Sequence, residues 1–173
     1  MNDRDDLADR FLKACARHNI MAATAESCTG GMIISALTDI PGSSSVVDRG
    51  FVTYSNEAKI EMLGVAPATL DKHGAVSSET ACEMAAGALK HSRAGIALAV
   101  TGIAGPDGGS PEKPVGLVWF GLALAGKPVV AEKVIFETPG RDFIRRETVK
   151  HALNMGLKAL AGEPRPKDYA TGP

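Results

Sequence analysis

The sequence lacks a strong excess of charge of either sign. Its 173 residues include 19 Lys and Arg against 20 Asp and Glu, which gives a formal net charge of −1. A nucleic-acid-binding domain is typically basic, and a charged interaction tail is a block of like charges. The charge balance therefore indicates no nucleic-acid partner.

Cysteine is scarce, and its spacing argues against two kinds of site. The three cysteines, Cys15, Cys28 and Cys82, are odd in number and contain no C-x-x-C pair. Neither a disulfide framework nor a thiolate zinc site is indicated. We therefore expect a reduced, cytoplasmic protein.

Long hydrophobic runs are also missing. The longest apolar stretches, such as residues 117–125, are well short of the ~18 residues that a membrane span needs. The N-terminus, MNDRDDLADRF, is acidic and has no apolar segment of the kind found in signal peptides. The sequence therefore predicts neither export nor a membrane partner.

The hydrophobic residues that are present make up 45% of the chain and follow secondary-structure periods. Helices are expected over residues 3–18 and 143–160, where apolar residues recur at helical spacing. Ser77 is a plausible N-cap for another helix that runs to about residue 91. Further helices are expected at GGMIISALTDI, NEAKIEML and ATLDKH.

Five segments have the composition of strands. NIMAATAES, VVDRGFVTYS and GIALAV alternate with the helices, whereas LVWFGLALAG and VVAEKVIFE follow each other closely and predict a hairpin. This order predicts an α/β fold, a three-layer α/β/α sandwich on a mixed, mostly parallel sheet. We expect one domain over residues 1–162 and a flexible C-terminal tail over residues 163–173, which is rich in polar residues and proline.

Two side chains that could act as nucleophiles stand together in ESCTGG, where the first strand gives way to its helix. Ser27 and Cys28 would lie at the mouth of a parallel sheet, beside the free N–H groups of a helix N-terminus. The alternative is structural: Ser27 or Thr29 caps the helix, and the glycine pair allows a tight turn.

A serine nucleophile needs a base, and none of the four histidines lies next to a nucleophilic motif. A buried lysine can serve instead when its pKa falls toward about 7–8. In FVTYSNEAK, Tyr54 ends a strand and Lys59 lies one turn into the next helix. If the first two strands are neighbours, Lys59 and Ser27 would emerge at the same edge; otherwise Lys59 is an ordinary solvated lysine.

Two further stretches suit an anion. VTGIAGPDGG follows a buried strand and exposes backbone N–H groups in a glycine-rich turn, which also fits a flexible connector. It lacks the G-x-G spacing of the dinucleotide fingerprint. GRDFIRRE places Arg141, Arg145 and Arg146 near the start of the last helix, where one of them could pair with phosphate and the others form surface salt bridges.

Six blocks in order carry a resemblance to a known family: TAESCTGG, LTDIPGSSS, RGFVTYSNEAK, HGAVSSET, VTGIAGPDGG and KPVGLVWFG. Over about residues 7–160 the chain resembles the CinA C-terminal domain family, in its stand-alone form. Members of this family are nicotinamide-nucleotide amidases, which convert nicotinamide mononucleotide into nicotinate mononucleotide and ammonia. The resemblance implies that activity, a pyridine nucleotide as the small-molecule substrate, and no metal or organic cofactor.

The resemblance also implies roles for individual residues. Ser27 would be the nucleophile, Lys59 its base, and Tyr54 would lie beside them. The oxyanion would lie near Thr29 and Gly30. The substrate phosphate would bind at a site drawn from Thr101, Gly102, Gly105, Ser44 and Arg145.

Two alternatives stay open on the sequence. Cys28 could be the nucleophile with Glu26 and Lys59 as partners, because Glu26 and Cys28 would share one face of the strand and exclude Ser27. A non-catalytic nucleotide-binding or regulatory module would use the same glycine turns. The sequence also leaves the oligomeric state open, a homo-oligomer included.

Overall fold

A five-stranded sheet forms the centre of the computed structural model, which describes residues 3–137 and 140–162. The strand order is β2-β1-β3-β4-β5. Strands β1 and β2 are parallel, as are β1 and β3, whereas β4 is antiparallel to both β3 and β5. The strands are β1 (Ala22–Glu26), β2 (Val47–Val52), β3 (Ile96–Gly102), β4 (Leu117–Leu124) and β5 (Val130–Ile135).

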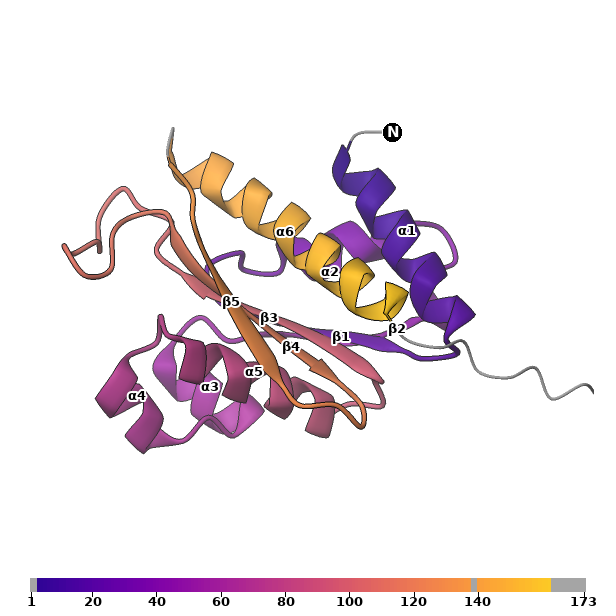
Figure 1. The fold of residues 1–173 in the computed structure, drawn as a ribbon, viewed down its shortest axis with the longest axis horizontal. Helices are drawn as coiled ribbons and strands as arrows, with labels where there is room; N and C mark the ends of the chain where they lie inside the picture. Colours follow the sequence, from indigo (N-terminus) through magenta and orange to yellow (C-terminus); the bar gives the residue numbers. More distant parts are fainter. Residues whose placement is uncertain (1–2, 138–139, 163–173) are drawn as a thin grey trace, which may run out of the picture.

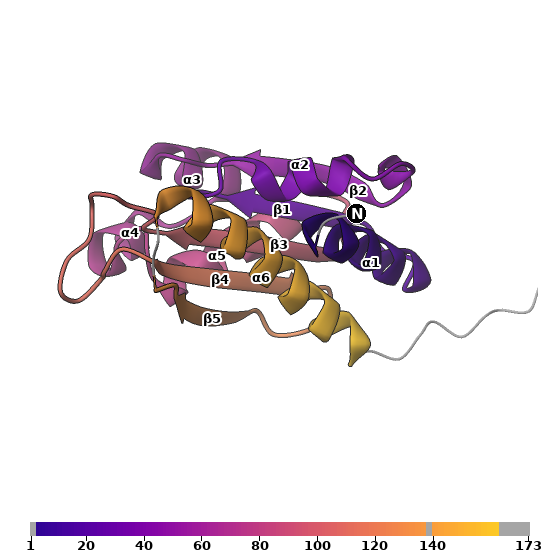
Figure 2. The same cartoon turned by 90° about the horizontal axis from the view of Figure 1, so that it is seen from above.

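Helices cover both faces of this sheet, as Figure 1 shows, and Figure 2 gives the view from above. One face carries α1 (Asp3–Arg17), α2 (Met32–Thr38) and α6 (Arg141–Ala161). The other face carries α3 (Asn56–Leu63), α4 (Pro67–His73) and α5 (Ser78–Lys90).

The predicted fold class is confirmed. Four of the five strands point the same way and only β4 runs against them, so the sheet is mixed and mostly parallel. The predicted cap is also confirmed, because the Ser77 hydroxyl accepts a hydrogen bond from the Thr80 amide at the start of α5. The predicted C-terminal tail, residues 163–173, lies outside the described residues.

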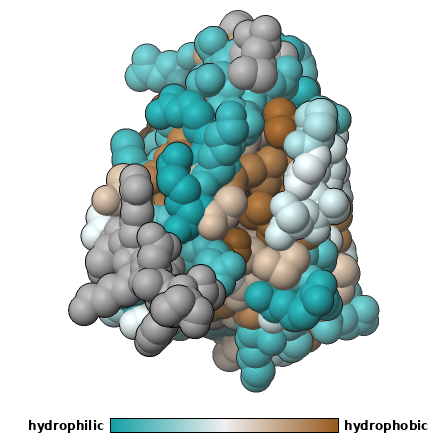
Figure 3. Space-filling model, turned by 90° about the vertical axis from the view of Figure 1, so that its right-hand side faces the viewer, coloured by the Kyte–Doolittle hydropathy of each residue, from teal (hydrophilic) through white to brown (hydrophobic). Residues whose placement is uncertain are grey.

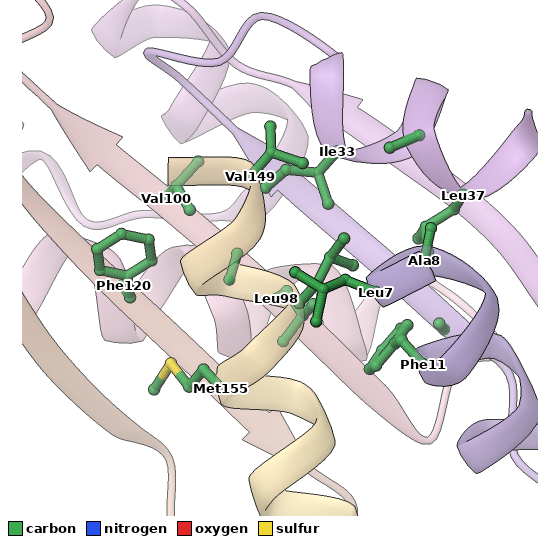
Figure 4. Packing of buried hydrophobic residues seen from close by; sticks show 14 of the residues in the cluster. Leu7, Ala8, Phe11, Ile33, Leu37, Leu98, Val100, Phe120, Val149 and Met155 are labelled. Carbon is green, nitrogen blue, oxygen red and sulfur yellow. The ribbon is translucent and has the colours of Figure 1, made fainter. Parts of the chain in front are cut away.

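Large apolar side chains fill the layer between the sheet and α1, α2 and α6. Because strand residues alternate between faces, every second residue of β3 and β4 points into this layer. Figure 4 shows the packing of its labelled members, which are Leu7, Ala8, Phe11, Ile33, Leu37, Leu98, Val100, Phe120, Val149 and Met155.

The opposite face of the sheet is lined by small residues. Five buried alanines face α5 and its neighbours, and Gly121 extends this surface. A Cβ atom added at Gly121 would come 2.2 Å from the Ala81 carbonyl oxygen of α5, so α5 lies almost directly on the strand backbone. The alanines are Ala23, Ala25, Ala97, Ala99 and Ala123.

The same close packing continues from α5 to α3. A Cβ atom added at Gly87 would come 2.0 Å from the carbonyl oxygen of Leu63, the last residue of α3. Glycine at position 87 therefore sets how closely α3 approaches α5. This contact fixes the position of α3 relative to the sheet.

The end of the molecule where β1, β2 and β3 begin carries a band of hydrophobic surface flanked by hydrophilic surface (Figure 3). Half-buried Ile20, Ile40 and Val47 pack against the core. Within residues 3–137 and 140–162, no helix is long and apolar enough to cross a membrane.

We predict that Gly87→Ala destabilises the fold because the new methyl group must displace the Leu63 carbonyl. We expect a loss of about 3 kcal/mol in the free energy of unfolding, or a melting temperature lower by about 5–10 °C. Gly162→Ala is the matched control, since its nearest neighbour lies 3.7 Å away and its backbone is α-helical. Equal melting temperatures for the two variants would contradict the prediction, and calorimetry of both measures it.

Candidate active site

A pocket of about 280 Å³ lies at the carboxyl ends of the three parallel strands. Loops at this edge of a parallel sheet are free to carry function, because the strands below hold their ends rigidly. The residues that line the pocket are Ser27, Cys28, Tyr54, Asn56, Lys59, Ala75, Val76, Thr101, Gly102, Ala104 and Arg141.

The structure brings Ser27 and Lys59 together. The Nζ atom of Lys59 lies 3.0 Å from the Oγ atom of Ser27 and 2.9 Å from the carbonyl oxygen of Thr53. Strands β1 and β2 are neighbours in the sheet, as the predicted approach of Lys59 to Ser27 required. Thr53 and Lys59 flank the start of α3, so the turn that begins this helix aims the lysine back at the strand end.

Lys59 is only 1% exposed, so the alternative of a solvated lysine is wrong. Helix α3 begins at a proper cap, since the Ser55 hydroxyl accepts a hydrogen bond from the Ala58 amide at 3.0 Å. Burial lowers the pKa of Lys59 from its ordinary value because the ammonium loses hydration. This shift favours the neutral amine, which is the form that can accept a proton.

Glu26 precedes Ser27 and points to the opposite face of the sheet, toward α2. Its carboxylate is fully buried and accepts hydrogen bonds from two hydroxyls and three amides. Three of these donors are amides at the N-terminus of α2, where an anion satisfies otherwise free N–H groups. The donors are Thr24 Oγ1, Thr29 Oγ1, Gly31 N, Ile33 N and Ile34 N.

Cys28 is 5% exposed and belongs to the apolar cluster beside α2 and α6. Burial raises the pKa of its thiol to about 12, and the nearby Glu26 charge acts in the same direction. Glu26 and Cys28 thus share one side of the strand, as the alternation predicted. Ser27 is left with Lys59 on the other side.

Tyr54 lies at the rim of the pocket and is 64% exposed. Its hydroxyl accepts a hydrogen bond of 3.2 Å from Arg141, which also donates to the Gly105 carbonyl at 2.9 Å. Arg141 thus joins the start of α6 to the loop after β3. Of the three arginines at the start of α6, it is the one that lines the pocket.

Arg145 lies behind residues 27–30, which we call the nucleophile loop after the candidate nucleophile Ser27, and does not line the pocket. Its Nε atom donates to the Cys28 carbonyl and its Nη2 atom to the Thr29 carbonyl, each at 3.0 Å. Thr29 is fully buried, and its hydroxyl bonds Glu26 at 2.6 Å. Gly30 has a φ of +58°, a conformation that a side chain would strain.

The residues expected at the phosphate separate into two groups. Gly102 lines the pocket, and Thr101 lines it too while its hydroxyl donates to the Ala75 carbonyl at 2.7 Å. Gly105 contributes the carbonyl that holds Arg141. Ser44 precedes β2 and so lies at the opposite end of the sheet from the pocket. The prediction that Ser44 binds the phosphate in this pocket of the same chain is therefore wrong.

A model of the CinA C-terminal domain matches residues 4–160 of the chain, which is most of its length. The chain belongs to the CinA C-terminal domain family. Solved structures of the CinA superfamily have the same fold. The competence/damage inducible protein CihA of Agrobacterium tumefaciens superposes with a TM-score of 0.89 at 53% identity, covering 93% of this chain and 97% of that one.

Other relatives differ in length and name. The nicotinamide-nucleotide amidohydrolase PncC of Escherichia coli K12 is 50% identical over 147 residues, which are 85% of this chain and 88% of that protein. A protein of Caldanaerobacter subterraneus named for competence-damage induction is 47% identical over 92% of this chain. The chain spans 38% of the length of that longer relative.

Four pocket residues of this CinA domain were missed from the sequence. Asn56 begins α3, Ala75 and Val76 precede α5, and Ala104 follows β3. They lie within the blocks RGFVTYSNEAK, HGAVSSET and VTGIAGPDGG, but three of them are small apolar residues and Asn56 carries no group that could act as a nucleophile or base. Within residues 3–137 and 140–162, no three His, Cys, Asp or Glu side chains gather where they could hold a metal ion.

We predict that Glu26→Gln destabilises the protein, because an amide would present a donor to groups that all donate. We expect a loss of about 3 kcal/mol in the free energy of unfolding, measured by urea denaturation. Glu61→Gln, at an exposed position of α3, should change stability by less than about 0.5 kcal/mol. An unchanged midpoint for Glu26→Gln would show that the carboxylate does not hold α2.

Proposed function

We propose that the chain is an amidohydrolase that converts nicotinamide mononucleotide into nicotinate mononucleotide and ammonia. The observation that carries this proposal is the buried contact of 3.0 Å between Lys59 Nζ and Ser27 Oγ at the bottom of an open pocket. The substrate comes from the name of the Escherichia coli relative, which is half identical over most of the chain.

The reaction begins when neutral Lys59 takes the hydroxyl proton of Ser27. The Ser27 oxygen attacks the carboxamide carbon, and the carbon–nitrogen bond then breaks as Lys59 returns the proton to the departing ammonia. Lys59 then takes a proton from water, whose oxygen attacks the acyl carbon of the ester. The bond from that carbon to the Ser27 oxygen breaks, Lys59 returns the proton to the Ser27 oxygen, and the released nicotinic acid group ionises to the carboxylate. Each proton that enters Lys59 leaves again, so the cycle is balanced.

The oxyanion of this reaction needs an N–H donor next to the nucleophile. The Gly30 amide already donates to the Ser27 carbonyl at 3.0 Å, and Thr29 is fully buried. We therefore assign the donor to the amide of Cys28, the residue after the nucleophile. In this assignment Thr29 and Gly30 shape the loop and are not donors.

The phosphate is proposed to lie against Arg141, at the rim of the pocket. A guanidinium is the preferred partner of phosphate, and Arg141 already bridges the rim through Tyr54 and Gly105. Tyr54 would then orient Arg141 and the ribose phosphate. Gly102 lines the same pocket, and its lack of a side chain lets β4 approach, because a Cβ atom there would come 2.8 Å from the Leu117 carbonyl oxygen.

Ser27 is favoured over Cys28 as the nucleophile by two observations. A thiol with a pKa of about 12 carries almost no thiolate at neutral pH, and the Glu26 carboxylate is occupied by five donors. The triad of Cys28, Glu26 and Lys59 would need both groups to be free.

We predict that the purified protein releases ammonia from nicotinamide mononucleotide and that Ser27→Ala abolishes this release. Cys28→Ala should retain most of the activity, because its side chain packs against the apolar cluster and alanine keeps that contact apolar. A coupled ammonia assay measures all three proteins, and circular dichroism checks their folding. Activity in Ser27→Ala together with loss in Cys28→Ala would reverse the assignment, and nucleotide binding without ammonia release would favour a binding module.

We predict that Lys59→Arg lowers kcat about a hundredfold or more, because a guanidinium stays protonated and cannot accept a proton. The matched control is Lys72→Arg, at an exposed position of α4, which should keep full activity. Near-normal turnover by Lys59→Arg would mean that position 59 supplies only charge.

The pH dependence of kcat tests the same lysine. Since burial lowers the pKa of Lys59, the neutral, active form is lost only as the pH falls through that lowered value, so kcat should rise with pH along an acid limb. This limb should be absent from the residual activity of Lys59→Ala. An identical limb in wild type and Lys59→Ala would exclude Lys59 as the base.

A further inference from the structure

We infer that Arg145 is a positioning residue that holds the nucleophile loop in its reactive conformation, and that it does not bind the substrate phosphate. The inference rests on the proposed function for its kinetic part. It concerns an arginine that sequence reasoning assigned to the phosphate. The contacts of its guanidinium point to a different role.

The guanidinium of Arg145 binds two consecutive carbonyls of the nucleophile loop. The donors Nε and Nη2 reach the oxygens of Cys28 and Thr29, each at 3.0 Å, so one rigid planar group spans both peptide units. The preceding carbonyl, of Ser27, accepts from the Gly30 amide at 3.0 Å. Three successive carbonyls, those of residues 27–29, thus each accept a hydrogen bond.

Holding these carbonyls fixes the amides as well, because each peptide unit is planar and its N–H points opposite to its C=O. The orientation of the Cys28 amide is set by the Ser27 carbonyl and its partner. Arg145 sets the next two peptide units and so prevents the loop from turning away from Lys59. The contact joins α6 to a loop 116–117 residues earlier in the chain.

The loop is built to receive this guanidinium. Gly30 has a left-handed φ of +58°, and a Cβ atom added there would come 3.4 Å from Arg145 Nη2. A residue with a side chain would therefore be strained in this backbone conformation, and its Cβ atom would lie in contact with the guanidinium. Glu26 holds the same loop from its other end through Thr29 and Gly31.

The charge of Arg145 also acts on the loop. Within residues 3–137 and 140–162 no carboxylate forms an ion pair with it, whereas Arg146 pairs with Asp142. Its positive charge is one of the influences that lower the pKa of Cys28, although burial outweighs it. The same charge would stabilise the negative oxygen that forms beside Ser27.

The inference predicts that Arg145→Met lowers kcat about a hundredfold, the usual scale for a displaced reacting group, while KM changes little. Arg145→Lys should lose about tenfold, since an ammonium can replace only part of the two-point contact and one lost hydrogen bond has this effect. The dissociation constant of the product, nicotinate mononucleotide, should stay the same in both variants. Calorimetric titration measures it without turnover.

Two other arginines of α6 provide the comparison. Arg141→Met should weaken product binding, because that guanidinium is proposed to meet the phosphate. Arg146→Met, at an exposed position paired with Asp142, should behave as wild type. If Arg145→Met instead weakens product binding as Arg141→Met does and leaves kcat intact, Arg145 is a phosphate ligand and the inference is wrong.

A readout without activity separates this inference from the proposed function. Amide hydrogen exchange over residues 27–31 should accelerate in Arg145→Met and stay unchanged in Arg146→Met. If wild type released no ammonia, the proposed function would fail, but the exchange result would still show whether Arg145 holds the nucleophile loop. Unchanged exchange in a folded Arg145→Met protein would overturn the inference.

Discussion

The buried carboxylate of Glu26 is the contact on which the active site depends. It accepts hydrogen bonds from three amides at the start of α2 and from two hydroxyls, so it joins the end of β1 to the helix that follows. The nucleophile loop lies between these two anchored ends and has little freedom left. A negative group at a helix N-terminus usually stabilises the helix, and here it also sets where Ser27 can point.

The alternation of β1 then separates two kinds of chemistry. Even-numbered Glu26 and Cys28 lie on the α2 side, where Glu26 is fully bonded and Cys28 is packed in the core. Ser27 lies on the α3 side, where the alanine and glycine surface lets α5 approach closely and brings α3 with it. Lys59 is buried as a result, so its desolvation depends on small residues that do not themselves line the pocket.

Much of this arrangement could be predicted from the sequence, because it depends on periodicity and local order. The strands, the helices, the Ser77 cap and the approach of Lys59 to Ser27 all follow from alternating patterns and from parallel strands ending at one edge. The direction in which a long side chain points cannot be predicted in this way. The pattern GRDFIRRE contains three arginines that the sequence alone does not distinguish. Only the packing of α6 shows that Arg141 lies at the rim of the pocket and Arg145 behind the nucleophile loop.

The prediction for Ser44 was wrong for a related reason. A serine-rich turn after a helix looks the same in sequence whether it precedes or follows a strand that reaches the site, and here it precedes β2. For Lys59, the position in the sequence predicted that it lies near Ser27. Its exposure of only 1% could not be predicted, because it depends on how closely Gly87 and the sheet alanines let the helices pack.

The strand order also bears on how the chain reaches this state. Strand β1 pairs with β3, so residues 22–26 must find residues 96–100 across most of the first half of the chain, whereas β4 and β5 are joined by a short turn. Pairings between distant segments form slowly, because the entropy of closing the intervening chain is lost before the contacts compensate. The hairpin should therefore form early and the parallel strands late. The contact between Ser27 and Lys59 lies where two of the parallel strands end, so it should form with this late pairing.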